Sequence, residues 1–429
     1  MTLRRFARCA AWYDTSAIAH VNVRRSFLKA QLGRRTPSAR RIVTLQAKGG
    51  SDQDAAEKGE GDKGKGKEEP GSSSKTEAEA VAAATAAVLA DEPSTDTIQA
   101  AAEAATTEEE AAKKLEAEPV ISPALQAIYD QCQTWQWKGQ HKINYVKIGT
   151  GPPIVLVHGF GASLGHWRKN IPVLSKTHTV YAVDMIGYGR SEKPAGFVYT
   201  METWAEQLQD FLTDVVRAPT ILMGNSLGSL TALIAAAEGG PELVKGCVLV
   251  NCAGGMNNKA IADDWRVAML LPVFWFIDFL LAQEKLAGGI FNRFRTSQNI
   301  QTVLRSVYVN EAAVDRELVE IISRPAGDEG ALHAFCSILS GPPGPRPEKL
   351  LPRISTPILL VWGDTDTFIP VDGPIGRFFT ALPKTNPNVE LTIISGGHCP
   401  HDDKHELFHD AVLPWLEKVS AGRKVLVQS

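Results

Sequence analysis

The sequence predicts an α/β fold with a mainly parallel central sheet and helices on both of its faces. Short β-rich runs alternate with longer helical patterns from about Thr134 onward, which is typical of consecutive strand, helix, strand units. The run IVLVH at residues 154–158 has the apolar character of a strand that is buried on both faces. In addition, the segment MGNSLG at residues 223–228 joins one such strand to a helix of small residues.

The expected strands follow one another in a regular order along the chain. The run WQWKGQHKINYVKIG at residues 135–149 indicates two strands joined at Gly139, because glycine suits a tight turn. Further apolar runs rich in β-branched residues are expected to form strands at residues 154–158, 179–184, 220–225, 247–251, 357–363 and 389–395. Helices are expected between most of them, which favours parallel strands.

The segment from residue 253 to residue 356 separates two expected strands and is too long for a simple loop. Because it shows helical periodicity, we expect an inserted helical lid at about residues 253–356. It contains an apolar run at residues 267–283 that is interrupted by Pro272 and Asp278. This run is too short to span a bilayer. A buried or lid helix is the preferred interpretation, and a helix in contact with a membrane surface is the alternative.

The N-terminal part of the chain has a composition unlike that of a folded domain. Residues 1–48 contain 11 Lys or Arg and a single acidic residue, Asp14, whereas residues 51–118 contain 18 Asp or Glu, 7 Lys and no aromatic residue. We expect residues 1–48 to be a transit peptide for the chloroplast, with the mitochondrion or a basic disordered arm as alternatives. Residues 49–118 are expected to be a disordered, acidic, Ala-rich linker. The folded domain then spans residues 119–429.

Composition also excludes some classes of partner. The expected domain carries a net charge of about −2 and has no block of Lys or Arg, which argues against a nucleic-acid partner held through its phosphates. The six cysteines form no CxxC pair and have no accompanying histidines at zinc-site spacing, so we expect a reducing compartment and no metal. The oligomeric state stays open.

The MGNSLG segment has the form of a nucleophile elbow, in which a strand turns sharply into a helix. Gly224 and Gly228 are needed because side chains there would clash, and Ser226 is then held at the tip of the turn. A serine that only caps the following helix is the alternative. We therefore expect Ser226 to act as a nucleophile.

A serine nucleophile needs a base within hydrogen-bond reach and an acid that orients this base. A histidine follows the last expected strand in GGHCPHD, and we choose His398 over His401 because it stands directly after two flexible glycines. Two acids, Asp364 and Asp366, follow the preceding strand in GDTDTFIP, and the residues alone leave both open. Such groups gather at the carboxyl edge of an open α/β sheet.

Two Gly-containing loops follow the expected strands at 154–158 and 179–184. HGFG at residues 158–161 lets a backbone N–H point at a developing oxyanion, and His158 itself is expected to be structural. DMIGYGRSEKP at residues 184–194 lacks the Lys and Ser or Thr of a phosphate-binding loop. We therefore assign this second loop a structural role and expect no cofactor.

The motifs together, in the chain order Ser, Asp, His, resemble those of the α/β-hydrolases. HGFGAS, the helix IPVLSK, GNSLG and the segment from SVYVN to RPA resemble more narrowly the plastid chlorophyll dephytylases and pheophytinases, from about Trp135 to Leu416. The resemblance implies that Asp366 is the orienting acid and that the N–H groups of Phe160 and Leu227 form the oxyanion hole. One departure is Ser229, where members of this group often have a second glycine.

The resemblance implies a serine hydrolase that cleaves a carboxylic ester through an acyl-enzyme, with the phytyl ester of chlorophyll or pheophytin as the expected substrate. Peripheral contact with the thylakoid membrane stays open. A plastid esterase or lipase acting on another ester is the first alternative, and a non-catalytic binding protein of the same fold is the second. Epoxide hydrolases and haloalkane dehalogenases are disfavoured because they need a carboxylate where Ser226 stands.

Overall fold

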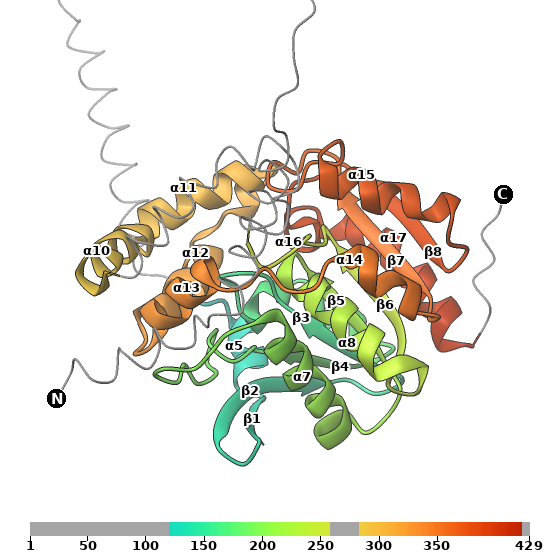
Figure 1. Ribbon diagram of the computed structural model, residues 1–429, viewed down its shortest axis with the longest axis horizontal. Coiled ribbons are helices and arrows are strands. Elements are labelled where there is room, and N and C mark those ends of the chain that lie inside the picture. The colour runs from blue at the N-terminus through green and yellow to red at the C-terminus, as the bar shows by residue number, and fades with distance from the viewer. Residues whose placement is uncertain (1–119, 258–282, 423–429) are drawn as a thin grey trace, which may run out of the picture. The chain divides into compact units, whose positions relative to one another are not determined.

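The computed structural model describes residues 120–257 and 283–422, which form one eight-stranded sheet with helices on both faces (Figure 1). The order across the sheet is β1-β2-β4-β3-β5-β6-β7-β8; β2 pairs antiparallel with β1 and β4, and all other pairs are parallel. The strands are β1 Cys132–Trp137, β2 His141–Ile148, β3 Pro153–Val157, β4 Thr179–Val183, β5 Thr220–Asn225, β6 Val244–Val250, β7 Ile358–Gly363 and β8 Val389–Ile394.

The predicted α/β class with a mainly parallel sheet is therefore confirmed, and every expected strand is present. The largest differences are at two boundaries: β1 begins at Cys132, before Trp135, and β6 begins at Val244, before Cys247. The predicted limits of several other strands are shifted by one residue. The predictions for residues 1–118, and for all but the last residue of the apolar segment 267–283, lie outside the described residues.

Side-chain caps mark the start of several helices. Thr200 accepts a hydrogen bond from the Thr203 N–H at the start of α7, and Asp315 accepts one from the Leu318 N–H at the start of α12. The main helices are α5 Pro123–Tyr129, α6 Ile171–Leu174, α7 Met201–Phe211, α8 Leu227–Leu243, α10 Glu284–Phe294, α11 Ser297–Val307, α12 Arg316–Ser323, α13 Ala331–Ser340, α14 Pro347–Leu350, α15 Pro374–Ala381, α16 Pro400–Asp403 and α17 His405–Ser420.

Alternating side chains of the central strands pack into two separate cores. Val155 and Val157 of β3 belong to the core shared with α7, α8 and α15, whereas Ile154 and Leu156 belong to the core shared with α5, α6 and α17. All four side chains are fully buried. A strand that is apolar on both faces is therefore required here, which explains the continuous apolar run in the sequence.

The described part of the connection between β6 and β7 is mainly helical. Helices α10 to α14 lie in this connection, and Figure 1 shows α10 to α13 grouped to one side of the sheet. Their apolar faces include a small core of their own around Leu304, Tyr308 and Leu318. The helical character predicted for residues 253–356 agrees with these elements, whereas their action as a lid stays a prediction.

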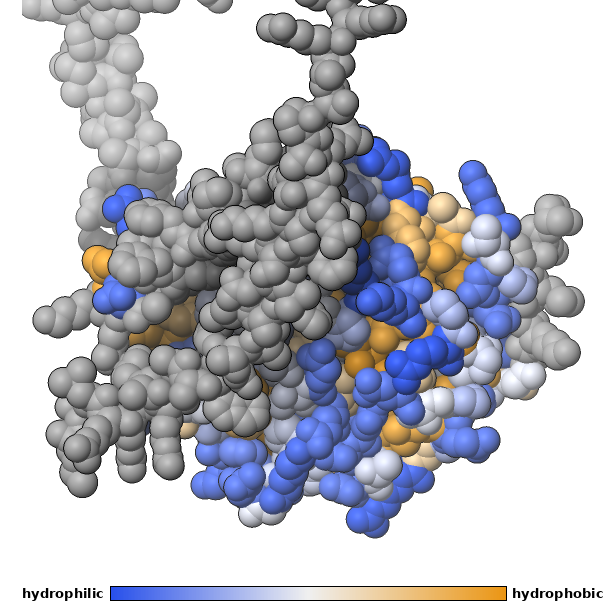
Figure 2. Space-filling view, in the orientation of Figure 1, coloured by the Kyte–Doolittle hydropathy of each residue, from blue (hydrophilic) through white to orange (hydrophobic). Residues whose placement is uncertain are grey.

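One face of the described part of the chain has a mixed surface. Figure 2 shows mainly hydrophilic side chains near β1, β2 and the end of α7, with hydrophobic ones in separate patches. Within residues 120–257 and 283–422, no helix is long and apolar enough to cross a membrane.

Asp184, which follows β4, ties three parts of the fold together through its buried carboxylate. The carboxylate accepts hydrogen bonds from the Leu164 N–H (2.6 Å), the Asn144 side-chain amide (2.8 Å) and the Arg190 N–H (2.8 Å). The Ser191 hydroxyl donates to the Asp184 carbonyl oxygen (2.7 Å). These contacts agree with the structural role expected for the loop at residues 184–194.

Replacing Asp184 by alanine should lower the free energy of unfolding by about 3 kcal/mol or more, because each buried donor left without an acceptor costs about 1–3 kcal/mol. Urea denaturation of the full chain measures this change. The control is Asp130→Ala, since Asp130 is exposed and should shift stability by about 0.5 kcal/mol or less. Equal stability of the two variants would contradict the role of Asp184.

Candidate active site

The turn from β5 into α8 places Ser226 in a strained backbone conformation. Its φ of 53° and ψ of −115° lie outside the regions that L-residues normally adopt. The turn is tight enough that a Cβ at Gly224 would collide with the backbone of Gly228, and one at Gly228 would collide with the Val157 carbonyl. Both glycines are therefore required, as the sequence predicts.

The buried Ser229 hydroxyl fastens this turn to the neighbouring strand. It donates to the Gly224 carbonyl (2.6 Å) and accepts from the Val250 N–H of β6 (2.9 Å), while the Ser226 N–H donates to the Val250 carbonyl (2.9 Å). A glycine at this position would lack these bonds. The departure from the family pattern is thus a structural bridge between α8 and β6.

His398 and Asp366 lie together at the carboxyl edge of the sheet. The Nδ1 atom of His398 is 2.8 Å from Oδ2 of Asp366, which also accepts from the Asn251 side-chain amide (2.6 Å). The other oxygen, Oδ1, accepts from the N–H groups of Phe368 (2.8 Å) and Ile369 (2.9 Å). The buried carboxylate is therefore fixed by four donors, and the ring of His398 is oriented by it.

Electrostatics favour the charged form of Asp366. Burial raises the pKa of its carboxyl group, but the hydrogen bond and positive charge of His398, together with the donors Ile369 and Asn251, outweigh burial and lower the pKa overall. Asp364 is exposed, and its carboxylate accepts hydrogen bonds from the Thr365 hydroxyl and the Gly396 N–H within the described residues. Of the two acids that the residues left open, Asp366 is the one that contacts His398.

His401, the alternative to His398, lies in a separate buried cluster. Its ring packs against Trp167 (centroids 4.3 Å apart) and His166 (4.5 Å), and burial is the main cause that lowers its pKa well below the usual value. Neither ring nitrogen has a hydrogen-bond partner among the described residues. This neutral ring contributes packing and makes no contact with Asp366.

The HGFG loop lies against the tip of the elbow. A Cβ at Gly159 would lie 3.4 Å from the Cβ of Ser226, and the Phe160 N–H that follows has no acceptor among the described residues. Leu227 is the first residue of α8, so its N–H has no carbonyl partner within the helix. The structure thus leaves both N–H groups unused beside Ser226.

His158 at the start of this loop is held by the backbone on both sides. Its Nδ1 is 2.8 Å from the Gly159 carbonyl, and its Nε2 accepts from the Met185 N–H (3.1 Å). Complete burial lowers the pKa of this ring, which keeps it neutral. These contacts agree with the structural role expected for His158.

Ser226 and His398 are brought together through the residue that precedes the serine. The Asn225 side-chain amide donates to the His398 carbonyl (3.1 Å). Within the described residues the Ser226 hydroxyl has no hydrogen-bond partner, so the hydrogen bond between serine and histidine is not formed. Such hydrogen bonds are often long without substrate and shorten when substrate binds.

The buried Asp403 carboxylate, which sequence reasoning missed, clamps the His398 loop to the inserted helices. It accepts from the Gly397 N–H (2.8 Å), the Val309 N–H (3.0 Å) and the Asn310 N–H (2.8 Å). The His398 N–H also donates to the carbonyl of Val307 (2.8 Å), the last residue of α11. The only signal in the sequence is the acid pair that follows GGHCPH.

Sequence reasoning also missed Asn251, a second residue that holds Asp366. It follows β6, and its backbone has a positive φ of 45°. While its amide donates to Asp366, its side-chain oxygen accepts from the Gly363 N–H (3.2 Å) at the end of β7. Its place at the carboxyl end of a strand was the signal that could have identified it.

An apolar cavity of about 150 Å³ opens beside the HGFG loop. The ring of Phe335 in α13 is its centre, with Phe160 (6.0 Å between centroids), Phe291 (5.1 Å) and Phe294 (6.1 Å) around it. The cavity is therefore built jointly by the loop after β3 and by α10 and α13 of the insertion. We call it the apolar pocket.

Comparison with known proteins shows which proteins this chain resembles. A family model described as alpha/beta hydrolase fold matches residues 152–405. The chain is similar to a chloroplastic pheophytinase of Arabidopsis thaliana, with 27% identity over 334 residues that cover 67% of this chain and 66% of that protein. The chain thus matches slightly less than two thirds of that relative's length.

Two further relatives have a similar extent. The magnesium-chelatase 30 kDa subunit of Rhodobacter capsulatus is 29% identical over 271 residues, which cover 62% of this chain and 87% of that protein. The solved structure of a thermophilic esterase from Thermogutta terrifontis superposes with a TM-score of 0.52 at 21% identity, over 68% of this chain and 99% of that chain. The likeness to this structure shows the fold.

The lowered pKa of Asp366 predicts a pH-dependent contribution to stability. Because the folded-state pKa is depressed, the charged carboxylate stabilises the fold above its ordinary pKa of about 3.9, and this contribution is lost as the pH falls through the folded-state pKa. Asp366→Asn should therefore lower the free energy of unfolding by about 2 kcal/mol near pH 6, and by less near pH 3. Urea denaturation across this pH range measures the difference.

The control is Asp364→Asn, which changes an exposed carboxylate two residues away. We expect it to alter stability by about 0.5 kcal/mol or less at either pH. A stability difference between wild type and Asp366→Asn that stays constant from about pH 6 to about pH 3 would contradict the assigned charge state.

Proposed function

Because the chain belongs to the α/β-hydrolase family, as its motifs predict, we propose that it is a serine hydrolase that cleaves a carboxylic ester through an acyl-enzyme. Ser226 is the nucleophile, His398 the general base and Asp366 the acid that orients the base. The observation that carries the proposal is the His398 ring, held 2.8 Å from Asp366, beside a serine in a strained turn. Strained backbone conformations concentrate at functional sites.

The proposed reaction has two steps. His398 Nε2 removes the proton of the Ser226 hydroxyl, which attacks the ester carbonyl, while the N–H groups of Phe160 and Leu227 stabilise the oxyanion. The same nitrogen then protonates the leaving alcohol. A water activated by His398 hydrolyses the acyl-enzyme, and Asp366 keeps Nδ1 protonated and stabilises the imidazolium throughout. This mechanism uses no cofactor.

As the substrate we propose an apolar ester, with the phytyl ester of chlorophyll or pheophytin preferred. The similarity to pheophytinase supports this choice, and the apolar pocket beside Phe160 supplies a surface for a hydrocarbon chain. A lipase or esterase acting on acyl lipids is the second candidate, because the same pocket would accept an acyl chain equally well. The identity of the leaving alcohol separates the two.

We propose the chloroplast as the compartment, with peripheral contact to the thylakoid membrane. The basic residues 1–48 and the similarity to a chloroplastic relative support the first part. The exposed apolar side chains of Leu286, Phe294 and Val303 support the second, because they lie on the inserted helices α10 and α11, and Phe294 also lines the apolar pocket. An insoluble substrate would then enter from the membrane surface.

Ser226→Ala should lower ester hydrolysis at least about a thousandfold, because removal of the nucleophile leaves only binding and oxyanion stabilisation. The assay incubates the full chain with chlorophyll a, pheophytin a and p-nitrophenyl acetate and separates the products by chromatography. Chlorophyllide or pheophorbide that requires Ser226 supports dephytylation. Cleavage of the short ester alone would point to another ester, and no turnover together with no labelling by a fluorophosphonate would point to a binding protein.

Phe294→Ala should lower kcat/KM for long-chain p-nitrophenyl esters about tenfold and leave the acetate ester unchanged, because it removes a ring from the apolar pocket. Phe294 is 53% exposed, so the fold should tolerate the change. The matched control is Leu286→Ala on the same helix, which is 50% exposed and does not line the pocket. An equal loss in both variants would argue against this pocket as the chain-binding site.

A further inference from the structure

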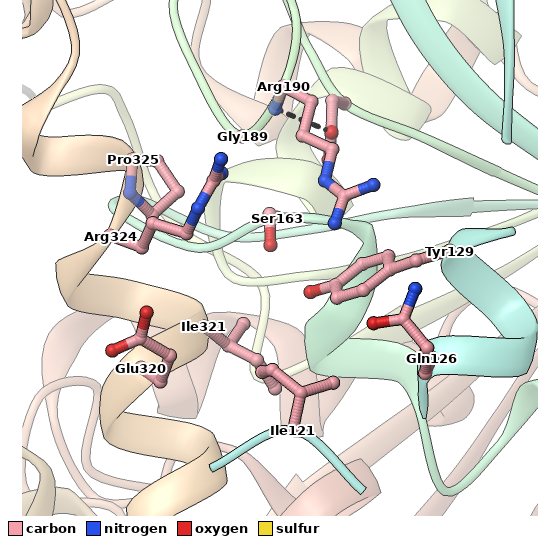
Figure 3. A pocket seen from close by; sticks show the side chains of 11 residues that line it. Ile121, Gln126, Tyr129, Ser163, Gly189, Arg190, Glu320, Ile321, Arg324 and Pro325 are labelled. Atoms are coloured by element: carbon pink, nitrogen blue, oxygen red, sulfur yellow. Dashed lines mark hydrogen bonds between the residues drawn. The ribbon is translucent and has the colours of Figure 1, made fainter. Parts of the chain in front are cut away.

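A second, polar cavity of about 240 Å³ lies between α5, the loops after β3 and β4, and the end of α12 (Figure 3). Its lining includes Tyr129 of α5, Ser163, Arg190 and Arg324. Two guanidinium groups thus face one cavity from segments that are far apart in the sequence. We call this cavity the polar pocket.

Both arginines are exposed, and neither guanidinium has a carboxylate partner among the described residues. In the described part of the chain, Arg190 stacks on the ring of Tyr129 (3.8 Å) and Arg324 has no side-chain partner, and neither forms an ion pair. Figure 3 shows the two groups on either side of Ser163. Arg168 is different, because it pairs with three carboxylates: Asp315 (3.1 Å), Glu317 (3.0 Å) and Asp402 (3.2 Å).

Uncharged donors line the same cavity. Ser163 is only 4% exposed, and its hydroxyl has no hydrogen-bond partner among the described residues although it points into the pocket. Burial, the largest cause, raises the pKa of Tyr129 to about 12, so its hydroxyl stays protonated and available as a donor. Both hydroxyls can therefore donate a hydrogen bond to a group that is bound in the cavity.

The two acids in the lining do not cancel this pattern. The Asp184 carboxylate is already occupied by three donors, namely the Leu164 N–H, the Asn144 amide and the Arg190 N–H. Glu320 precedes Arg324 by one helical turn but forms no ion pair with it in the described residues. Because Glu320 repels an anion, an anion in this pocket would have to lie nearer to the two guanidinium groups than to Glu320.

We propose that the polar pocket is an oxyanion-binding site that holds a carboxylate or phosphate between Arg190 and Arg324, with Ser163 as a third donor. Guanidinium groups match the planar oxygens of these anions through paired hydrogen bonds. The ligand class is thus a molecule that carries a carboxylate or a phosphate. It is either a free anion or an anionic group attached to the ester substrate.

The position of the polar pocket would let one amphipathic substrate occupy both pockets. This part of the proposal rests on the proposed function. The polar and apolar pockets share Gly189 and Pro325 in their linings. Phe160 lines the apolar pocket and Ser163 the polar one, so their Cα atoms lie at most about 11 Å apart. An ester with an anionic group several carbons from its carbonyl would reach both.

Two measurements test the proposal on the full chain. Isothermal titration calorimetry with inorganic phosphate compares the wild type with Arg324→Gln. Hydrolysis assays compare p-nitrophenyl half-esters of adipic, suberic and sebacic acids with their methyl-capped counterparts. We expect Arg324→Gln to weaken phosphate binding about tenfold, and to lower kcat/KM of at least one half-ester about tenfold with the capped esters unchanged.

Arg305→Gln is the matched control, because Arg305 is exposed on α11 and lines neither pocket. Arg190→Gln repeats the test from the other wall and replaces Arg324→Gln if that variant does not fold. Arg324-dependent phosphate binding without a half-ester preference assigns the site to a free anion, and a preference that Arg324→Gln abolishes assigns it to the substrate.

The proposal is overturned if phosphate binding and half-ester preference are the same in wild type, Arg324→Gln and Arg190→Gln. Failure of the proposed function has a different signature. If no ester is hydrolysed but phosphate binding still depends on Arg324, the hydrolase proposal fails and the oxyanion site stands.

Discussion

The turn at Ser226 is the constraint on which the arrangement of the site depends. A positive φ at a non-glycine residue is unfavourable, so the neighbouring backbone must hold it in place. The Val250 carbonyl accepts the Ser226 N–H, and the Ser229 hydroxyl bridges β5 and β6. The absence of a side chain at Gly228 lets α8 approach the carbonyl of Val157 in β3. The ends of three central strands are therefore fixed by one turn.

The histidine side of the site depends on the insertion between β6 and β7. The loop that carries His398 is bonded to the Val307 carbonyl, and Asp403 accepts N–H groups from both the loop and residues 309 and 310. Bonds to a buried charged acceptor are stronger than those between neutral groups. Any movement of these inserted helices would therefore displace the histidine, so the insertion belongs to the site and does more than cover it.

The sequence predicted the elements whose signals are local. Apolar runs located the strands, and the glycines around Ser226 located the elbow, because both signals depend on neighbouring residues only. The choice between Asp364 and Asp366 needed the family resemblance, since both follow the same strand. Asn251 and Asp403 escaped prediction because the partners that reveal their roles, Asp366 and Val309 respectively, lie more than 90 residues away in the chain. Pairing over such separations leaves no periodic pattern in one sequence.

The distribution of charge argues that the two pockets have different tasks. Arg168 is buried and pairs with three carboxylates of the described chain. Without these partners, the removal of its charge from water would be unfavourable. At the polar pocket the same type of side chain lacks such partners and remains partly in water, although acidic residues are abundant in the sequence. Two unpaired guanidinium groups and the Ser163 hydroxyl line one cavity, so an anion bound there would find donors on several sides. An ester that carries a charge at one end and a hydrocarbon at the other would use both pockets.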